Sequence, residues 1–140
     1  MARNMINSTN IAEQIVEPDE NVLFVVDKIK SCGCNGCNYI VHEAGSGQFL
    51  LRGQGIYRVL FSTNLTSAEA GNAIIDIESN GENVNEAKIE IPIVVDTFIR
   101  ETTFADIIVP CGTSKTITIG NNSIIPINFK NTNIEIKRIG

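Results

Sequence analysis

The stretch Gly53–Leu65 constrains the fold more than any other part of the chain. Within it the large apolar side chains Tyr57, Val59 and Phe61 alternate with polar ones such as Arg58. An alternation with a period of two is typical of a β-strand that has one face in a hydrophobic core. Because tyrosine and phenylalanine bury the largest apolar areas of the side chains present, we expect this face to lie at the centre of the fold.

The same alternation recurs along the chain and predicts an all-β protein. It appears at residues 73–78, 88–94, 115–119 and 134–137, and Asn80-Gly81 is a strong signal for a tight hairpin turn. About eight to ten short strands result, with no helical pattern, and this predicts an antiparallel jelly-roll sandwich. Residues 97–110 are expected to form a bend followed by a buried strand. The positions predicted to pack the core or a subunit contact are Tyr57, Val59, Phe61, Ile75, Ile77, Ile134 and Ile136.

The first twenty residues differ in composition from the rest of the chain. They are polar and rich in asparagine, and their short apolar patch at Ile11, Ile15 and Val16 makes a poor helix stripe. We therefore divide the chain into an N-terminal arm, residues 1–20, and a jelly-roll domain, residues 21–140. The arm is expected to contain at most one short strand and to serve as an attachment segment that orders against its partner.

Charge and hydropathy exclude two classes of partner. The net charge of the 140 residues is −5, and lysines and arginines are scattered, so we expect no nucleic-acid partner. No apolar run approaches the roughly 20 residues of a membrane-spanning helix, and the N-terminus lacks the apolar core of a signal peptide. We expect synthesis in the cytoplasm without a signal peptide and no insertion into a membrane.

A cluster of cysteines is the sharpest chemical feature of the sequence. Cys32, Cys34 and Cys37 lie in a loop of turn-forming residues, His42 follows shortly after, and Cys111 is far along the chain. These thiols and the imidazole could bind zinc or another metal, although the spacing lacks the two paired ligand knuckles of most zinc sites. A disulfide within the loop or to Cys111, and free thiols kept reduced in a cytosol, are the alternatives.

No catalytic residue can be assigned from the sequence. His42 is the only histidine, and a lone histidine on a short strand is usually a structural hydrogen-bonding residue. A Cys37–His42 nucleophile pair would lack a third, orienting residue. The asparagine-rich stretches at residues 121–122 and 131–133 could contact a glycan or could be ordinary turn residues.

The order of several motifs resembles the tumour-necrosis-factor-like jelly roll, the superfamily that includes the globular heads of complement-type proteins. The motifs are Gly55-Ile56-Tyr57 at the start of an aromatic strand, Asn80-Gly81, the late turn Cys111-Gly112-Thr113 and the final apolar strand at residues 134–139. The likeness extends over about residues 20–140 and is greatest to small members from Firmicutes and their phages. The collagen-like stalk of many bacterial members is missing here.

The resemblance implies a homotrimer that acts as a binding head or a particle-surface protein and is not an enzyme. It favours a component of a phage virion surface, such as a head fibre, a decoration protein or a receptor-binding module that contacts other virion proteins through the arm. A cell-surface glycan is a candidate ligand. A bacterial cell-surface or spore-coat protein cross-linked through its cysteine loop is the first alternative, and a metal-binding protein that uses the Cys/His loop is the second.

Overall fold

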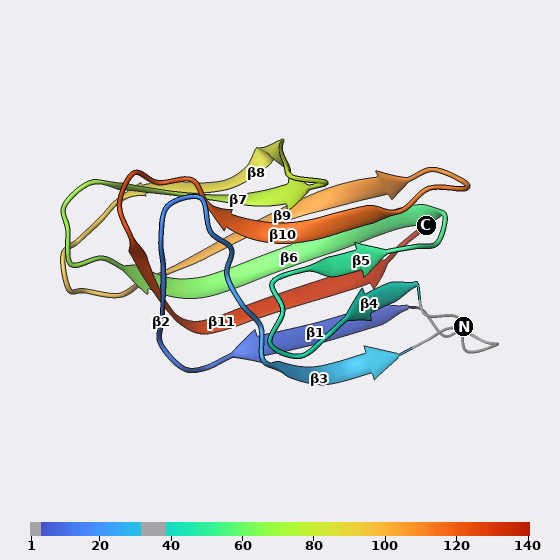
Figure 1. The fold of residues 1–140 in the computed structure, drawn as a ribbon, viewed down its shortest axis with the longest axis horizontal. Coiled ribbons are helices and arrows are strands. Elements are labelled where there is room, and N and C mark those ends of the chain that lie inside the picture. The colour runs from blue at the N-terminus through green and yellow to red at the C-terminus, as the bar shows by residue number, and fades with distance from the viewer. Residues whose placement is uncertain (1–3, 32–38) are drawn as a thin grey trace.

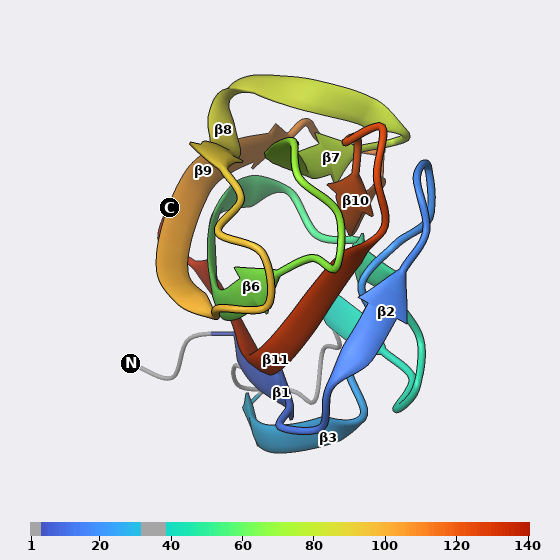
Figure 2. The same ribbon diagram turned by 90° about the vertical axis from the view of Figure 1, so that its left-hand side faces the viewer.

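The chain folds into two antiparallel sheets that pack face to face (Figure 1). The computed structural model describes residues 4–31 and 39–140. Figure 2 looks along the strands and shows the two layers enclosing the interior. No helix long and apolar enough to cross a membrane occurs among the described residues. The predicted all-β antiparallel jelly-roll sandwich is confirmed.

Six strands form the larger sheet. Its order is β3-β1-β11-β6-β9, and the short β2 pairs with β11. The strands are β1 (Met5–Asn10), β2 (Gln14–Val16), β3 (Val26–Ser31), β6 (Gly55–Thr66), β9 (Ile99–Val109) and β11 (Ile127–Arg138). The strands β3 and β9 are therefore the two opposite edges of this sheet.

Five strands form the smaller sheet, in the order β4-β5-β10-β7-β8. They are β4 (Ile40–His42), β5 (Phe49–Leu51), β7 (Asn72–Ser79), β8 (Glu82–Pro92) and β10 (Lys115–Asn121). The turn at Asn80-Gly81 joins β7 to β8, and both residues have positive φ values, 53° and 80°. This is the conformation that the primed hairpin turn requires. Pro92 lies on β8, an edge strand, where its missing N–H does not interrupt a ladder.

The core lies between the two sheets and is centred on aromatic side chains. Phe24 packs edge to face against Phe49, with ring centroids 5.4 Å apart, and against Phe61 at 6.2 Å. The Tyr57 hydroxyl donates a hydrogen bond to the Gly53 carbonyl at 2.6 Å, and burial raises the pKa of this phenol. The seven positions named above as core or subunit-packing residues are all fully buried in the single chain: Tyr57, Val59, Phe61, Ile75, Ile77, Ile134 and Ile136. A contact with a second copy would thus have to use other residues.

The N-terminal segment differs from the expected arm. Met5–Asn10 forms β1, an inner strand of the six-stranded sheet that pairs with β11 on one side and with the edge strand β3 on the other. Backbone pairing holds it there although only Ile6 supplies a large buried apolar side chain. The boundary expected at residue 20 therefore does not separate an arm from the sandwich.

Residues 22–26 connect the two sheets. The Val22 N–H donates to the Ile119 carbonyl of β10, whereas the Val25 N–H donates to the Thr9 carbonyl of β1. The segment thus passes from one sheet to the other, and β3 begins only at Val26.

Candidate functional site

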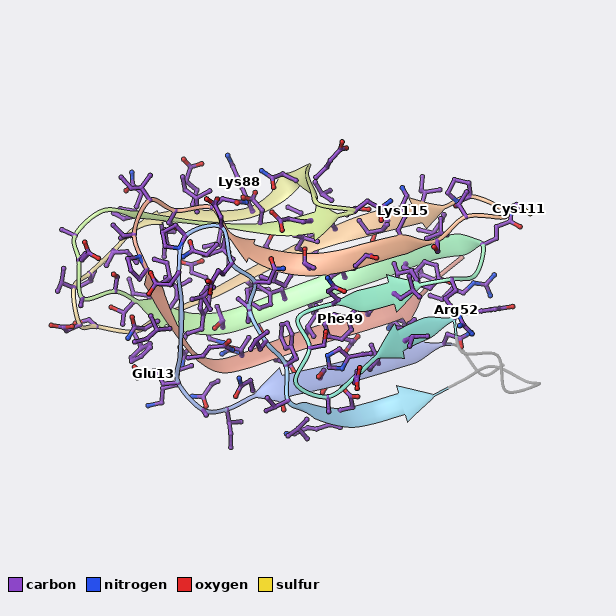
Figure 3. All side chains as sticks on the ribbon, viewed as in Figure 1. Glu13, Phe49, Arg52, Lys88, Cys111 and Lys115 are labelled. Atoms are coloured by element: carbon purple, nitrogen blue, oxygen red, sulfur yellow. The ribbon has the colours of Figure 1, made fainter. Side chains whose placement is uncertain are left out.

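The predicted cysteine site falls largely outside the described residues. Cys32, Cys34 and Cys37 lie outside the described residues. Cys111 is an exposed free thiol at the tip of the turn between β9 and β10 (Figure 3). Among the residues that are described, no group of three or more histidine, cysteine or acidic side chains could hold a metal ion.

His42 is a buried structural residue. Its Nδ1 lies 2.7 Å from an Asp27 carboxylate oxygen, and its Nε2 lies 2.9 Å from the Ser46 carbonyl oxygen. The ring also stacks on Phe49 with centroids 4.1 Å apart. Both ring nitrogens therefore face acceptor oxygens of the chain. Neither nitrogen is left to bind a metal or to activate a thiol.

The contact between His42 and Asp27 joins the two sheets. Asp27 belongs to β3, an edge of the six-stranded sheet, and His42 belongs to β4, an edge of the five-stranded sheet. The pair therefore closes one side of the sandwich. The sequence correctly indicated a hydrogen-bonding role for the histidine but not its partner.

An apolar surface covers the outer face of β6 and β9. Leu60 lies opposite Phe104, and Ile56 lies opposite Ile108, in the antiparallel register of the two strands. Phe104 and Ile108 are 58% and 62% exposed. We call these four side chains the β6–β9 surface. The expected buried strand at residues 97–110 is thus buried on one face only, because Ala105, Ile107 and Val109 point inward.

An ion pair lies within the β6–β9 surface. The Arg58 guanidinium donates to both oxygens of Asp106, at 2.8 and 2.9 Å, and lies over the Phe104 ring, 5.7 Å from its centroid. The hydrogen bond from Arg58 lowers the pKa of the Asp106 carboxyl and raises that of the guanidinium. A groove of about 380 Å³ between β8 and β9 adjoins this surface and is lined by Val84, Ala87, Phe104, Ala105 and Asp106.

A second apolar surface lies toward the opposite edge of the same sheet. The exposed side chains are Ile15 on β2, Leu23 and Val25 in the connecting segment, and Val26 at the start of β3. The Gln14 amide binds both the N–H and the carbonyl of Leu23, at 3.0 and 2.9 Å, and so holds this segment against β2. We call these four side chains the β2–β3 surface.

A polar groove lies on the outer face of the five-stranded sheet. It has a volume of about 570 Å³, and its lining includes Asn21, Gln48, Glu78, Asn80, Thr116 and Asn122. None of the described residues that line it is a lysine, an arginine or an aromatic residue. A second hollow of about 560 Å³, lined in part by Leu23 and Ser46, continues from it past Asn21 and Gln48.

The floor of the polar groove is fixed by hydrogen bonds. Thr118 donates to one oxygen of Glu78 at 3.0 Å, and the Asn122 amide donates to the other at 3.3 Å and to Asp76 at 2.6 Å. The Glu78 side chain lies over Gly120, where an added Cβ would come within 2.5 Å of its carboxylate. Glycine at position 120 therefore makes the room in which Glu78 lies flat.

Comparison with known proteins supports the fold. No protein-family model matches the chain, and no curated protein matches it in sequence. Among solved structures, the tumour necrosis factor Eiger of S. frugiperda has a TM-score of 0.64 at 7% identity, covering 100% of this chain and 94% of its own. The globular domain of zebrafish complement 1qA has a TM-score of 0.59 at 9% identity, covering 97% and 95%. The PRD1 vertex protein P5 has a TM-score of 0.60 at 9% identity, covering 100% and 99%. The fold is thus that of the tumour-necrosis-factor-like jelly roll.

Proposed function

We propose that the chain is a non-enzymatic, homotrimeric jelly-roll protein that acts as a structural or binding component on the surface of a phage virion. The observation that carries the proposal is the presence of two unlike apolar surfaces toward opposite edges of one sheet. The β6–β9 surface holds an aromatic ring and an ion pair, whereas the β2–β3 surface is aliphatic.

Two unlike surfaces suit a head-to-tail assembly. If the β6–β9 surface of one copy packs against the β2–β3 surface of the next, the same contact repeats around an axis and closes into a ring. Such contacts would cover side chains that a stable single chain rarely exposes together. The groove between β8 and β9 would receive part of the neighbouring copy. A ring of three copies is the arrangement that the resemblance to tumour-necrosis-factor-like proteins implies.

The location on a virion is supported by the likeness to the PRD1 vertex protein. In this proposal the protein is made in the cytoplasm and assembled as a head fibre, a decoration protein or a receptor-binding module. Attachment to other virion proteins would involve the N-terminal segment. Because β1 is already part of the sheet, the attachment would use a preformed surface and would not require an arm to order on binding.

Light scattering coupled to size exclusion tests the assembly. We expect a mass near three times the chain mass of 15.2 kDa. A mass near 15.2 kDa over the micromolar range would discard the trimer and with it the proposed ring. The virion location is tested separately, by probing purified particles for the protein.

A second candidate is a bacterial cell-surface or spore-coat protein that is cross-linked through cysteines. The exposed thiol of Cys111 favours it, because an exposed thiol can reach a second molecule. Gels without reductant would then show a ladder of species that collapses when reductant is added. A single band in both conditions would remove this candidate.

A further inference from the structure

We propose that the polar groove on the outer face of the five-stranded sheet binds a neutral, polyhydroxylated glycan. The inference rests on the proposed binding role and assigns that role to a site. The groove is formed where the segment around Asn21 and the residue Gln48 lie beside the β7–β8 turn and the strand β10. Its volume of about 570 Å³ is within the range of small-ligand sites.

The polar groups of the lining match hydroxyl ligands. The side-chain amides of Asn21 and Gln48 each carry donors and an acceptor, and the Thr116 hydroxyl can do both. A sugar hydroxyl likewise donates one hydrogen bond and accepts others, so a row of amides and hydroxyls can bind several sugar hydroxyls at once. The amide N–H groups of Asn122 are already taken by Asp76, Glu78 and Asn83. The hydrogen bonds from Thr118 and Asn122 hold the Glu78 carboxylate on the floor of the groove before a ligand arrives.

Charge excludes the acidic glycans. The groove is lined by the carboxylates of Asp19 and Glu78 and by no lysine or arginine among the described residues. The chain as a whole carries a net charge of −5. A sialic acid or a phosphate would therefore be repelled and would find no cationic partner.

A basic peptide or a metal cation fits less well than a neutral glycan. Both oxygens of Glu78 already accept hydrogen bonds, from Thr118 and Asn122. Asp19 is exposed and is the other carboxylate of the lining. Because the described residues of the lining include no aromatic ring for a sugar to stack on, a single copy should bind weakly. An assembly of three copies would gain avidity on a surface that carries many glycans.

The test uses the assembled protein and two pairs of matched variants. The labelled protein is applied to an array of neutral and sialylated oligosaccharides, and the best neutral oligosaccharide is then titrated by calorimetry. Thr116→Lys fills the groove with a long charged side chain, and Asn72→Lys places the same charge on the same sheet away from the groove. Gln48→Ala removes one amide of the lining, and Gln54→Ala removes an exposed amide elsewhere.

We expect binding to neutral oligosaccharides only. Thr116→Lys should lower the affinity at least about tenfold and Gln48→Ala by about two- to tenfold, as the loss of one hydrogen bond does. Asn72→Lys and Gln54→Ala should bind as the unmodified protein does, and all four variants should keep its mass.

Three results would overturn the inference. The first is binding that Thr116→Lys leaves intact, which would place the glycan elsewhere. The second is binding of sialylated glycans, an oligolysine peptide or calcium chloride in place of neutral sugars. The third is no binding to any neutral oligosaccharide by a protein whose mass shows the trimer, and that outcome would leave the proposed assembly standing.

Discussion

On the outer face of the six-stranded sheet, β6 and β9 expose Leu60, Phe104 and Ile108, whereas the outer face of the five-stranded sheet presents Glu78 and Asn122 over β7 and β10. Both sheets bury aliphatic and aromatic side chains on their inner faces, so the sandwich itself does not require this difference. An apolar outer face on one sheet and a hydrogen-bonded polar one on the other suggest two tasks. The first face suits contact with another copy, and the second suits a hydrated ligand.

Charging the β6–β9 surface should have the largest effect. The double substitution Phe104→Asp and Ile108→Asp would place two carboxylates in the proposed contact, at a cost of about 2 kcal/mol or more for each side chain. We expect the mass measured by light scattering to fall from three chains to one. Asn72→Asp, on the outer face of the other sheet, is the control and should leave the mass unchanged. A folded double variant that keeps the mass of three chains would show that the β6–β9 surface is not the contact between copies.

Removing the contact between His42 and Asp27, which links the two sheets, should have the second-largest effect. His42→Ala would leave the Asp27 carboxylate without its partner and open a gap beside Phe49. We expect the free energy of unfolding to fall by about 3 kcal/mol, because the hydrogen bonds of the ring and its packing against Phe49 are lost together. Urea unfolding measures it, with Lys88→Ala as the control because it breaks only an exposed pair with Glu90. A loss below about 1 kcal/mol would mean that the sheets do not depend on this contact.

Adding a methyl group at Gly120, beneath the Glu78 side chain, should lower the free energy of unfolding by a smaller amount. Gly120→Ala would push the Glu78 carboxylate off β10 and break its bonds to Thr118 and Asn122. We expect a loss of about 1 kcal/mol in the free energy of unfolding. In a Glu78→Ala background the same change should cost less, because the obstructing carboxylate is gone. Equal costs in the two backgrounds would disprove the proposed arrangement.

The exposed ion pair within the apolar face should matter least. The pKa of Asp106 is lowered in the folded chain, so its contribution to stability is present above the ordinary carboxyl pKa and is lost as the pH falls through the lower, folded value. Asp106→Asn should therefore lower the urea midpoint slightly at pH 7. The difference from the unmodified protein should shrink in acid. A difference that grows in acid would show that another group is responsible.

Much of the sandwich could be predicted because its core strands alternate. The alternation of Tyr57, Val59 and Phe61 predicts the buried face of β6. The pair Asn80-Gly81 predicts the hairpin between β7 and β8. The strand β1 could not be predicted in this way. Met5–Asn10 contains few apolar residues, and its position follows from backbone pairing with β3 and β11, which are distant in sequence.

The candidate surfaces were harder to predict than the core. Residues 104–109 are apolar at most positions, and a run of this kind does not show which side chains a sandwich leaves outside. The polar groove depends on a topology that brings Asn21, Gln48 and Thr116 together from separate parts of the chain. Asn122 lies in one of the two asparagine-rich stretches that could be either glycan contacts or ordinary turn residues, whereas residues 131–133 do not line the groove.

The strand β9 is an edge strand of eleven residues that is apolar on its inner face and, at Phe104 and Ile108, on its outer face as well. Strands of this type readily recruit other extended chains into fibrous aggregates. The charged side chains of Arg100 and Asp106 interrupt the apolar run and would act as gatekeepers against such growth. Assembly with other copies would therefore protect the chain from aggregation. A newly made chain that has not yet met other copies would be the form most prone to aggregate.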